Sequence, residues 1–461
     1  MNDFPGRRVA LSNARKVRPA TAIAVGAPAI TLLALLVQAP ADTQHDTARY
    51  EPTTHALTSA DLFCPASDRG SIRIASASTS TDAGSLTQRR PGTSTRTAVP
   101  LQVGGSRTID SPEGVLLHAE GGLAPGLTGA RLGEPRPSAR ECAAPGGVRW
   151  FVGAGSGASH LSTLTLANPD GGPAVADITI WSTDGELQDI ESRGLTISGG
   201  KVSTLALESL APDAHELAVR VVVSRGRLAA SVRDEFGKVG EALRTDALPA
   251  GASPSLVQVL PGLTRKASSR VLTLVNPGHS EAQVTLAIAG GRSTFAPSGV
   301  AEIRVPAGRV VVTDLTKALA KVTGSEDTSL IVRSTVPVAA GLRATVAGDL
   351  VHHPAIQLRT GLLSSVVPDV GAPTLVLTAG ETGGKVTVRW DSGQETTVQL
   401  NAGTTLAVPA PKHAHLVTLD ADAPVAAVVR TQTKDGAALL PLRAVATELL
   451  VPAVRPAWPP R

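Results

Sequence analysis

The strongest constraint on the fold is an internal repeat of about a hundred residues. Residues 162–169 read STLTLANP and residues 270–277 read RVLTLVNP, so that Asn276 follows Asn168 by 108 residues. A second alternating run comes after each Asn-Pro pair, at 174–180 and 282–288. Two runs of period two joined by turn residues predict a β-hairpin. The recurring Asn168-Pro169 and Asn276-Pro277 are explained by turn chemistry, because Asn bonds to local backbone and Pro fixes φ.

Each copy of the repeat closes on an apolar run that ends in an arginine. The three endings read LAASVR at 228–233, VAAGLR at 338–343 and VAAVVR at 425–430. The third copy lacks the Asn-Pro turn, since residues 374–378 read TLVLT, but its later segments keep the alternation. Three endings predict three modules, the third shorter than the others.

The spacing of strands and turns decides between fold classes. About six or seven short alternating runs per module, separated by Gly or Pro turns, predict immunoglobulin-like β-sandwiches. A parallel α/β sheet would need longer helices between strands, and propeller blades repeat at about 40–50 residues. We therefore predict an all-β chain with modules at 146–250, 255–350 and 356–452, an N-terminal β segment at 61–145 and a C-terminal tail at 453–461. The sequence leaves open whether 61–145 is a separate domain or completes the first sandwich.

The N-terminus carries a membrane signal. Residues 20–39 are apolar and uncharged, which as a helix would just cross a bilayer core. Five basic residues precede this segment: Arg7, Arg8, Arg15, Lys16 and Arg18. They predict a cytoplasmic tail at 1–19, a transmembrane signal anchor at 20–39 and, after a linker at 40–60, an extracytoplasmic remainder of the chain. A signal peptide cleaved after the small residues 39–41 is the alternative.

The chain has two cysteines, Cys64 and Cys142, and both follow the membrane segment. In an oxidising compartment they predict a disulfide. Two unpaired buried thiols are the alternative. Metal binding is disfavoured, because no further Cys or His stands at ligand spacing from either.

Composition excludes several partners. The net charge is +4 without a dense basic block beyond the tail, which argues against nucleic acid. Aromatic residues make up only 2% of the chain, which leaves little material for the stacking platform of a lectin or glycosidase. Trp150 and Trp181 are expected to fill module cores.

Candidate catalytic motifs fail on their context. Gly153, Gly155 and Ala158 fit a relaxed dinucleotide pattern, but the alternating strand that follows them cannot form the helix that a phosphate loop requires. Ser156 lacks the Gly-x-Ser-x-Gly spacing of a nucleophile elbow. We therefore predict no catalytic and no cofactor-binding residue.

Histidine and carboxylate pairs were the remaining candidates. His413 and His415 would share one face of a strand, and His352-His353 are adjacent, but neither pair has a nearby Cys or carboxylate ligand. We expect surface or edge histidines and no metal. Asp234-Glu235 and Glu326-Asp327 are candidates for the two carboxylates of a glycoside hydrolase, but the shortage of aromatic residues to hold a sugar disfavours that function.

Several of these segments together resemble a known family. Residues 142–151 read CAAPGGVRWF, and they stand beside the Leu-Thr-Leu-Xaa-Asn-Pro hairpins, the Val-Pro-Ala-Gly turn at 305–308 and the Val-Ala-Ala-Xaa-Xaa-Arg endings. This combination resembles secreted, single-pass proteins of unknown function from actinobacteria. The resemblance covers nearly all of the extracellular part. It implies localisation and architecture, and it lends no catalytic residue.

The expected function is that of a non-catalytic extracytoplasmic protein of the cell envelope. A rigid row of sandwiches would project from the membrane and serve as a scaffold or protein-interaction module. The alternative is an accessory protein that binds cell-wall polysaccharide or assists glycan processing. Expected partners are the membrane, through the N-terminal helix, and an envelope protein or cell-wall polymer, whereas the oligomeric state stays open.

Overall fold

The computed structural model describes residues 53–67, 69–187 and 193–451. Strands account for 58% of the structure and helices for 3%, which confirms the prediction of an all-β chain. The cytoplasmic tail, the membrane segment and the C-terminal tail predicted from the sequence lie outside the described residues. Within those residues, no helix combines the length and the apolar character that crossing a membrane requires.

Residues Ala56–Leu449 form one compact unit, and the described residues on either side of it belong to a second. Strands β1 (Thr53–Ala56) and β35 (Glu448–Val451) form a two-stranded sheet. The 40–60 range predicted as a linker therefore contains β1 and the first residues of the next strand.

Within Ala56–Leu449, the described strands form four modules, each built on eight strand segments in one pairing order, and modules 1, 2 and 3 each have one further short strand. The first, sixth, third and fourth segments make one sheet, and the fifth, second, seventh and eighth make the other. Both sheets of a module share one apolar core. The segment at 61–145 is therefore a module of the same kind as the three that follow it.

The bounds follow the chain from module to module. The N-terminal module consists of β2 (Ser59–Cys64), β3 (Ser71–Ser76), β4 (Gly84–Arg89), β5 (Thr97–Ala98), β6 (Ser106–Ile109), β7 (Val115–Gly121), β8 (Leu127–Gly133) and β9 (Ser138–Glu141). Module 1 consists of β10 (Val148–Ala154), β11 (Ser156–Gly157), β12 (His160–Ala167), β13 (Ala174–Trp181), β14 (Leu195–Ile197), β15 (Val202–Ala206), the 3-10 turn η1 (Leu207–Ser209), β16 (Leu217–Arg225), β17 (Ala229–Phe236) and β18 (Arg244–Leu248).

Module 2 consists of β19 (Ser255–Leu260), β20 (Ala267–Asn276), β21 (Ala282–Ala289), β22 (Thr294–Phe295), β23 (Ile303–Val305), β24 (Arg309–Asp314), the short helices α2 (Thr316–Ala320) and α3 (Val322–Ser325), β25 (Ser329–Val346) and β26 (Asp349–Pro354). Module 3 consists of β27 (Arg359–Val366), β28 (Thr374–Ala379), β29 (Gly384–Trp390), β30 (Glu395–Leu400), β31 (Thr405–Pro409), β32 (Leu416–Thr433), β33 (Gly436–Pro441) and β34 (Arg443–Ala444).

In modules 2 and 3 the sixth and seventh segments are one continuous strand. β25 and β32 each run for 18 residues, and each passes from one sheet of its module into the other. In module 1 the same path is interrupted at Gly226, where φ is +71°, between β16 and β17. Alternation along the strands buries every second side chain, as in β12 and β13.

The prediction of immunoglobulin-like modules is wrong. In an immunoglobulin domain the first strand pairs with the second and the last pairs with the sixth. Here the first strand of each module pairs with the sixth segment, and the eighth segment (β9, β18, β26 or β33) pairs with the seventh. Hydrophobic period reveals that a segment is a strand, but it does not reveal the neighbour in the sheet.

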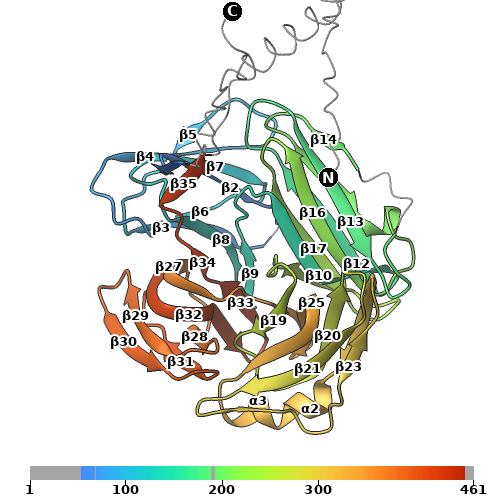
Figure 1. Cartoon of the computed structure of the whole chain (residues 1–461). Helices are drawn as coiled ribbons and strands as arrows, with labels where there is room; N and C mark the ends of the chain where they lie inside the picture. Colours follow the sequence, from blue (N-terminus) through green and yellow to red (C-terminus); the bar gives the residue numbers. More distant parts are fainter. Residues whose placement is uncertain (1–52, 68, 188–192, 452–461) are drawn as a thin grey trace, which may run out of the picture. The chain divides into compact units, whose positions relative to one another are not determined.

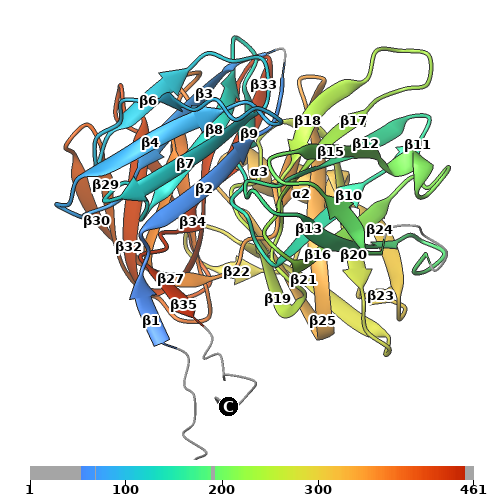
Figure 2. The same ribbon diagram turned by 90° about the horizontal axis from the view of Figure 1, so that it is seen from above.

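The four modules form a closed ring rather than the expected row. Each module contacts the next, and module 3 contacts the N-terminal module, so that β27 packs on β3 and β8. Figure 1 and Figure 2 both show the N-terminal module, in blue, beside module 3, in orange and red. The eighth segments, β9, β18, β26 and β33, contact one another around the middle of the ring.

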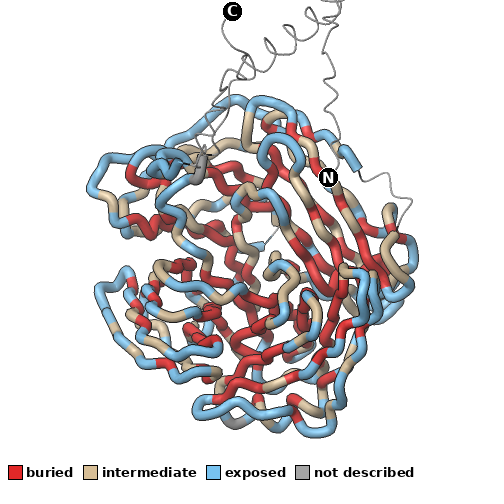
Figure 3. The backbone as a smooth tube through the Cα atoms, in the orientation of Figure 1, coloured by how far each residue is buried: buried red, intermediate tan, exposed pale blue. Residues whose placement is uncertain are grey.

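An apolar cluster lies at every junction of the ring. Figure 3 shows buried residues continuing along the strands where the modules meet. Between the N-terminal module and module 1, the cluster joins Phe63 and Leu116 to Ala167 and Ala229. Between modules 1 and 2 it joins Trp150, Val152 and Trp181 to Val275, Val310 and Ala339, and between modules 2 and 3 it joins Val259, Val346 and Val351 to Val376, Ala426 and Val428. At the fourth junction, Ala75, Ala130 and Leu132 of the N-terminal module pack on the core of module 3.

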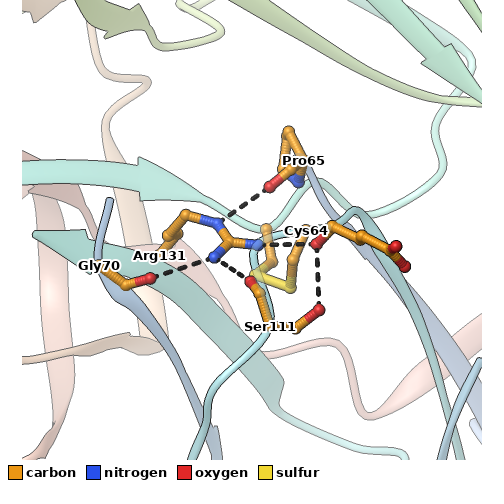
Figure 4. The surroundings of a disulfide bond; sticks show 7 residues. Cys64, Pro65, Gly70, Ser111 and Arg131 are labelled. Carbon is orange, nitrogen blue, oxygen red and sulfur yellow. Dashed lines mark hydrogen bonds between the residues drawn. A yellow bond between two sulfur atoms is a disulfide. The ribbon is translucent and has the colours of Figure 1, made fainter. Parts of the chain in front are cut away.

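The N-terminal module contains the disulfide between Cys64 and Cys142, in agreement with the sequence prediction. Both cysteines lie in the core of this module. Arg131 lies beside the bond and donates to the carbonyls of Pro65 at 3.0 Å and Gly70 at 3.2 Å, and to that of Ser111 (Figure 4). Burial lowers the pKa of Arg131. The arginine ties the connecting loops of the module to β8.

Candidate functional site

A buried ionic network occupies the junction between modules 1 and 2. The Asp234 carboxylate on β17 lies 3.1 Å from His160 Nε2 on β12 and 3.0 Å from His352 Nε2 on β26. The exposed fractions of Asp234, His160 and His352 are 0%, 1% and 3%. Burial alone would raise the pKa of Asp234, but the two imidazoles, His160 foremost, hold it below the usual value.

The same network includes a cross-module ion pair. Arg343 on β25 donates to Glu216 Oε1 at 2.5 Å, and its guanidinium lies 4.0 Å from the ring centroid of Phe236. At the next junction Arg430 on β32 donates to Asp327 Oδ1 at 2.6 Å. In both cases the arginine ends a Val-Ala-Ala-Xaa-Xaa-Arg segment, and the carboxylate lies one or two residues before the sixth strand segment of the preceding module.

The network has the composition of a hydrolytic triad but not its geometry. Ser162 Oγ donates to the Asp234 carboxylate rather than to an imidazole, and it accepts the Gly155 amide at 2.9 Å. A nucleophilic serine must be hydrogen-bonded to its base and open to substrate. Ser162 is 3% exposed, so this arrangement holds modules 1 and 2 together and offers no nucleophile to solvent.

Carboxylates also lie among the last strands at the middle of the ring. Burial raises the pKa of Asp349 on β26 to about 6, and it raises that of Asp246 on β18 well above the usual value. Arg136 Nη1 of the N-terminal module is 3.9 Å from Asp349. A Cβ added to Gly436 would lie 2.2 Å from Asp349 Oδ2, so glycine lets β33 approach the carboxylate. His353, on the face of β26 opposite to that of His352, is buried, and burial lowers its pKa to about 3.

An open polar cavity lies at the junction of the N-terminal module and module 1. Its volume is about 180 Å³. Arg227 in its wall donates to Asp61 Oδ2 at 2.8 Å and to Asp170 Oδ1 at 2.5 Å, so its charge is neutralised. Two further guanidinium groups, of Arg89 and Arg96, line the same cavity. We call this the first-junction cavity.

An apolar cavity of about 260 Å³ lies between modules 2 and 3. Val257, Val259, Ile331 and Leu358 line it, and the pair Arg333–Glu381, at 2.7 Å, is part of its wall. Its lining has no cluster of titratable groups besides that pair. It can accept an apolar group but carries no chemistry of its own.

The glycine and serine motif near residue 155 has a structural role. Ser156 Oγ donates to the carbonyls of Ala211 and, at 3.0 Å, Ala214, and Ser156 is buried. The segment continues into β12 rather than into a helix. It therefore fixes the connection before β16.

The expectation of surface or edge histidines is wrong for His352 and His353, whereas His413 is exposed and His415 is half-buried. His352 and His353 are buried in β26 and are neither surface nor edge residues. His413 and His415 lie in the connection between β31 and β32 rather than on a strand face, and His415 Nε2 is 3.3 Å from Asp369 Oδ1. Within the described part of the chain, no group of three or more His, Cys, Asp or Glu is placed to hold a metal ion.

The carboxylate pairs separate in the structure. Asp234 joins the buried network, whereas Glu235 lies 2.8 Å from Arg233. Asp327 pairs with Arg430, and Glu326 accepts the amide of Gly291 at 3.0 Å. Neither pair faces a shared cleft in the way that glycoside hydrolysis requires.

The sequence predicts that Trp150 and Trp181 fill module cores, but both lie at the junction between modules 1 and 2. Their rings stack at 5.1 Å between centroids, and they pack against Val310 and Ala339 of module 2. The Arg220 guanidinium lies 5.4 Å from the Trp181 ring centroid. These aromatic residues are part of the junction.

Asn168 and Asn276 repeat one bonding pattern. Asn168 Nδ2 donates to Gly172 O at 2.8 Å and to Ile197 O at 2.9 Å, and Asn276 repeats both bonds in module 2. The side chain thus closes the hairpin and holds the fourth strand, a role beyond the local turn bonding inferred from sequence. Sequence reasoning missed His160, Glu216, Arg89 and Arg227, because their partners stand far away along the chain.

A family model described as a family of unknown function (DUF5719) matches residues 103–411. A search of curated proteins gives no match. The matched range begins in the N-terminal module and ends in module 3, and it covers well over half of the chain. The chain belongs to this family of unknown function, DUF5719.

Proposed function

We propose that this chain is a non-catalytic binding protein of the cell envelope, exported beyond the membrane and anchored to it. The observation that carries the proposal is that the clustered ionisable groups are buried in contacts between modules. Asp234, His160 and His352 are buried in an inter-module contact, whereas open cavities lie at two junctions. Groups committed to holding modules together are poor candidates for turnover.

Export is supported by two independent features. The uncharged segment at 20–39 follows a basic tail, in the order that directs the following chain outward. The disulfide between Cys64 and Cys142 suits an oxidising compartment.

The closed ring supports a scaffold role. Each module is buried against two neighbours, so a partner that contacts two modules meets surfaces at a fixed separation. Preorganised surfaces lower the entropic cost of association. The expected partner is an envelope protein.

The first-junction cavity favours a second candidate, the binding of cell-wall polysaccharide. It is lined by both carboxylates and guanidinium groups, which can bond to hydroxyls and to acidic groups. This candidate differs from the first only in the partner.

The test uses the full-length protein in intact cells of its source organism. We expect external protease to cut the chain, and crosslinking to recover it with an envelope protein or with wall polymer. A fully reduced chain protected from protease until lysis would contradict export. Turnover of a wall polymer by the purified protein, lost in Asp234→Asn but not in Asp184→Asn, would contradict a non-catalytic role.

A further inference from the structure

The first-junction cavity holds two guanidinium groups that lack a carboxylate partner. Arg89, at the end of β4, donates to Pro169 O of module 1 at 2.7 Å and to Thr93 O at 3.4 Å. Both acceptors are neutral carbonyls. Arg96 is exposed, and within the described chain no protein group bonds to it or pairs with it. Unlike Arg227, neither of these two arginines donates to a carboxylate.

The two charges lie close enough to act on each other. Burial lowers the pKa of Arg89 and the charge of Arg96 lowers it further, whereas Asp61 and Asp170 act in the opposite direction. An anion placed between two such groups relieves their repulsion and accepts their free N–H donors. A planar guanidinium matches the oxygens of a carboxylate or a phosphate in bidentate fashion.

The rest of the lining suits hydroxyl groups. Asp61 accepts from His118 Nδ1 at 2.8 Å and from Arg227, and Asp170 accepts from Arg227. Each carboxylate oxygen can accept a further hydrogen bond, so hydroxyls of a ligand have acceptors in the cavity. A simple inorganic anion would leave these acceptors unused and lie near like charge.

The size of the cavity limits the ligand. At about 180 Å³ it is smaller than the pockets that enclose drug-sized molecules, and it suits a single small ring. Because the lining includes no Trp, Tyr or Phe, recognition depends on hydrogen bonds and charge. Such a site binds weakly as a monomeric subsite and gains strength from a polymer that presents many copies.

We propose that the first-junction cavity binds an acidic saccharide unit, whose carboxylate or phosphate lies between Arg89 and Arg96 and whose hydroxyls bond to Asp61 and Asp170. This inference rests on the proposed binding function and specifies the chemistry of one ligand. The shared chemistry is an anionic group on a polyhydroxylated ring.

The experiment is calorimetric titration of the full-length protein in detergent at low ionic strength. Glucuronic acid and glucose 1-phosphate are the acidic probes, and glucose and inorganic phosphate are the controls. We expect both acidic sugars, or one of them, to bind more tightly than either control. Binding of one alone identifies whether the anionic group is a carboxylate or a phosphate.

Arg96→Ala is the test variant, because Arg96 is exposed and has no protein partner to lose. We expect affinity for the acidic sugar to fall roughly tenfold, the loss typical of one charge-assisted contact. Arg90→Ala is the matched control, since Arg90 lies outside the cavity and pairs with Glu113 at 2.7 Å. It should bind like the wild type.

The inference would be overturned if glucose or inorganic phosphate bound as tightly as the tighter of the two acidic sugars, or if Arg96→Ala bound that sugar as well as Arg90→Ala does. Absence of any binding would also overturn it. If the chain were still recovered with an envelope partner in that case, the proposed function would stand and this cavity would not be its site.

Discussion

Removing the Asp234 carboxylate should weaken the junction between modules 1 and 2 more than any other single carboxylate change. Asp234 is fully buried and accepts hydrogen bonds from His160, His352 and Ser162. Deleting one member of a buried, paired network costs about 3–5 kcal/mol, because the remaining polar groups stay desolvated without partners. We expect a loss of that size in the unfolding free energy of Asp234→Ala at neutral pH. Asp234→Asn should recover part of it, since its amide oxygen still accepts one bond.

Urea unfolding followed by tryptophan fluorescence measures this effect directly. The stacked Trp150 and Trp181 lie at the same junction, so their emission reports on it. Asp184→Asn is the control, because Asp184 is exposed and should change stability by less than about 0.5 kcal/mol.

The same comparison has a predicted pH dependence. The pKa of Asp234 is depressed, so its stabilisation is present above the ordinary value of 3.8 and is lost as the pH falls through the folded pKa. The difference between wild type and Asp234→Ala should therefore shrink in acid. A loss below about 1 kcal/mol at neutral pH, equal to that of the control, would refute the reasoning.

Three further predictions follow from particular contacts. Gly341→Ala should destabilise by about 1–3 kcal/mol in the same urea assay, because its Cβ would lie 2.3 Å from Val152 O of β10, whereas Gly324→Ala has open space and should be neutral. As the pH rises from about 4 to about 6, the wild type should lose about 3 kcal/mol of unfolding free energy, because the raised pKa of Asp349 makes the folded state bind more protons than the unfolded state in this range. Asp349→Asn should lack this pH dependence, and an unchanged pH dependence in the variant would contradict its assignment to Asp349. Cys64→Ala with Cys142→Ala should lower the unfolding free energy by about 4 kcal/mol, because the bond closes a loop with a sequence separation of 78, and thermal melting under non-reducing conditions would detect it.

Strand content was predictable because alternation is a local property. The runs at 174–180 and 282–288 became β13 and β21 nearly to the residue. Pairing order was not predictable, since it depends on which strands meet after the chain folds back. For example, β10, the first strand of module 1, pairs with β16 some seventy residues later, and the sequence of β10 does not indicate which strand it will pair with.

The candidate site shows the same limit. Neighbouring strand residues point to opposite faces, so Asp234 and Glu235 could have been expected to separate. That Asp234 would meet His352 of another module, 118 residues away, requires the ring. The N-terminal module was likewise hidden, because it lacks the Asn-Pro hairpin and the Val-Ala-Ala endings that marked the other three.

The repeated endings themselves explain how the ring is built. The second residue of each ending, Ala229, Ala339 or Ala426, lies in the apolar cluster that joins its module to the preceding one. A small side chain there lets backbones approach, as the tight fit of Gly341 against β10 also shows. The terminal arginine then reaches the preceding module in two of the three endings, where it pairs with Glu216 or Asp327. The repeated endings, which mark the modules in the sequence, are thus contacts between modules. Their small residues and arginines suit the packing of one module on the next rather than the fold of a single module.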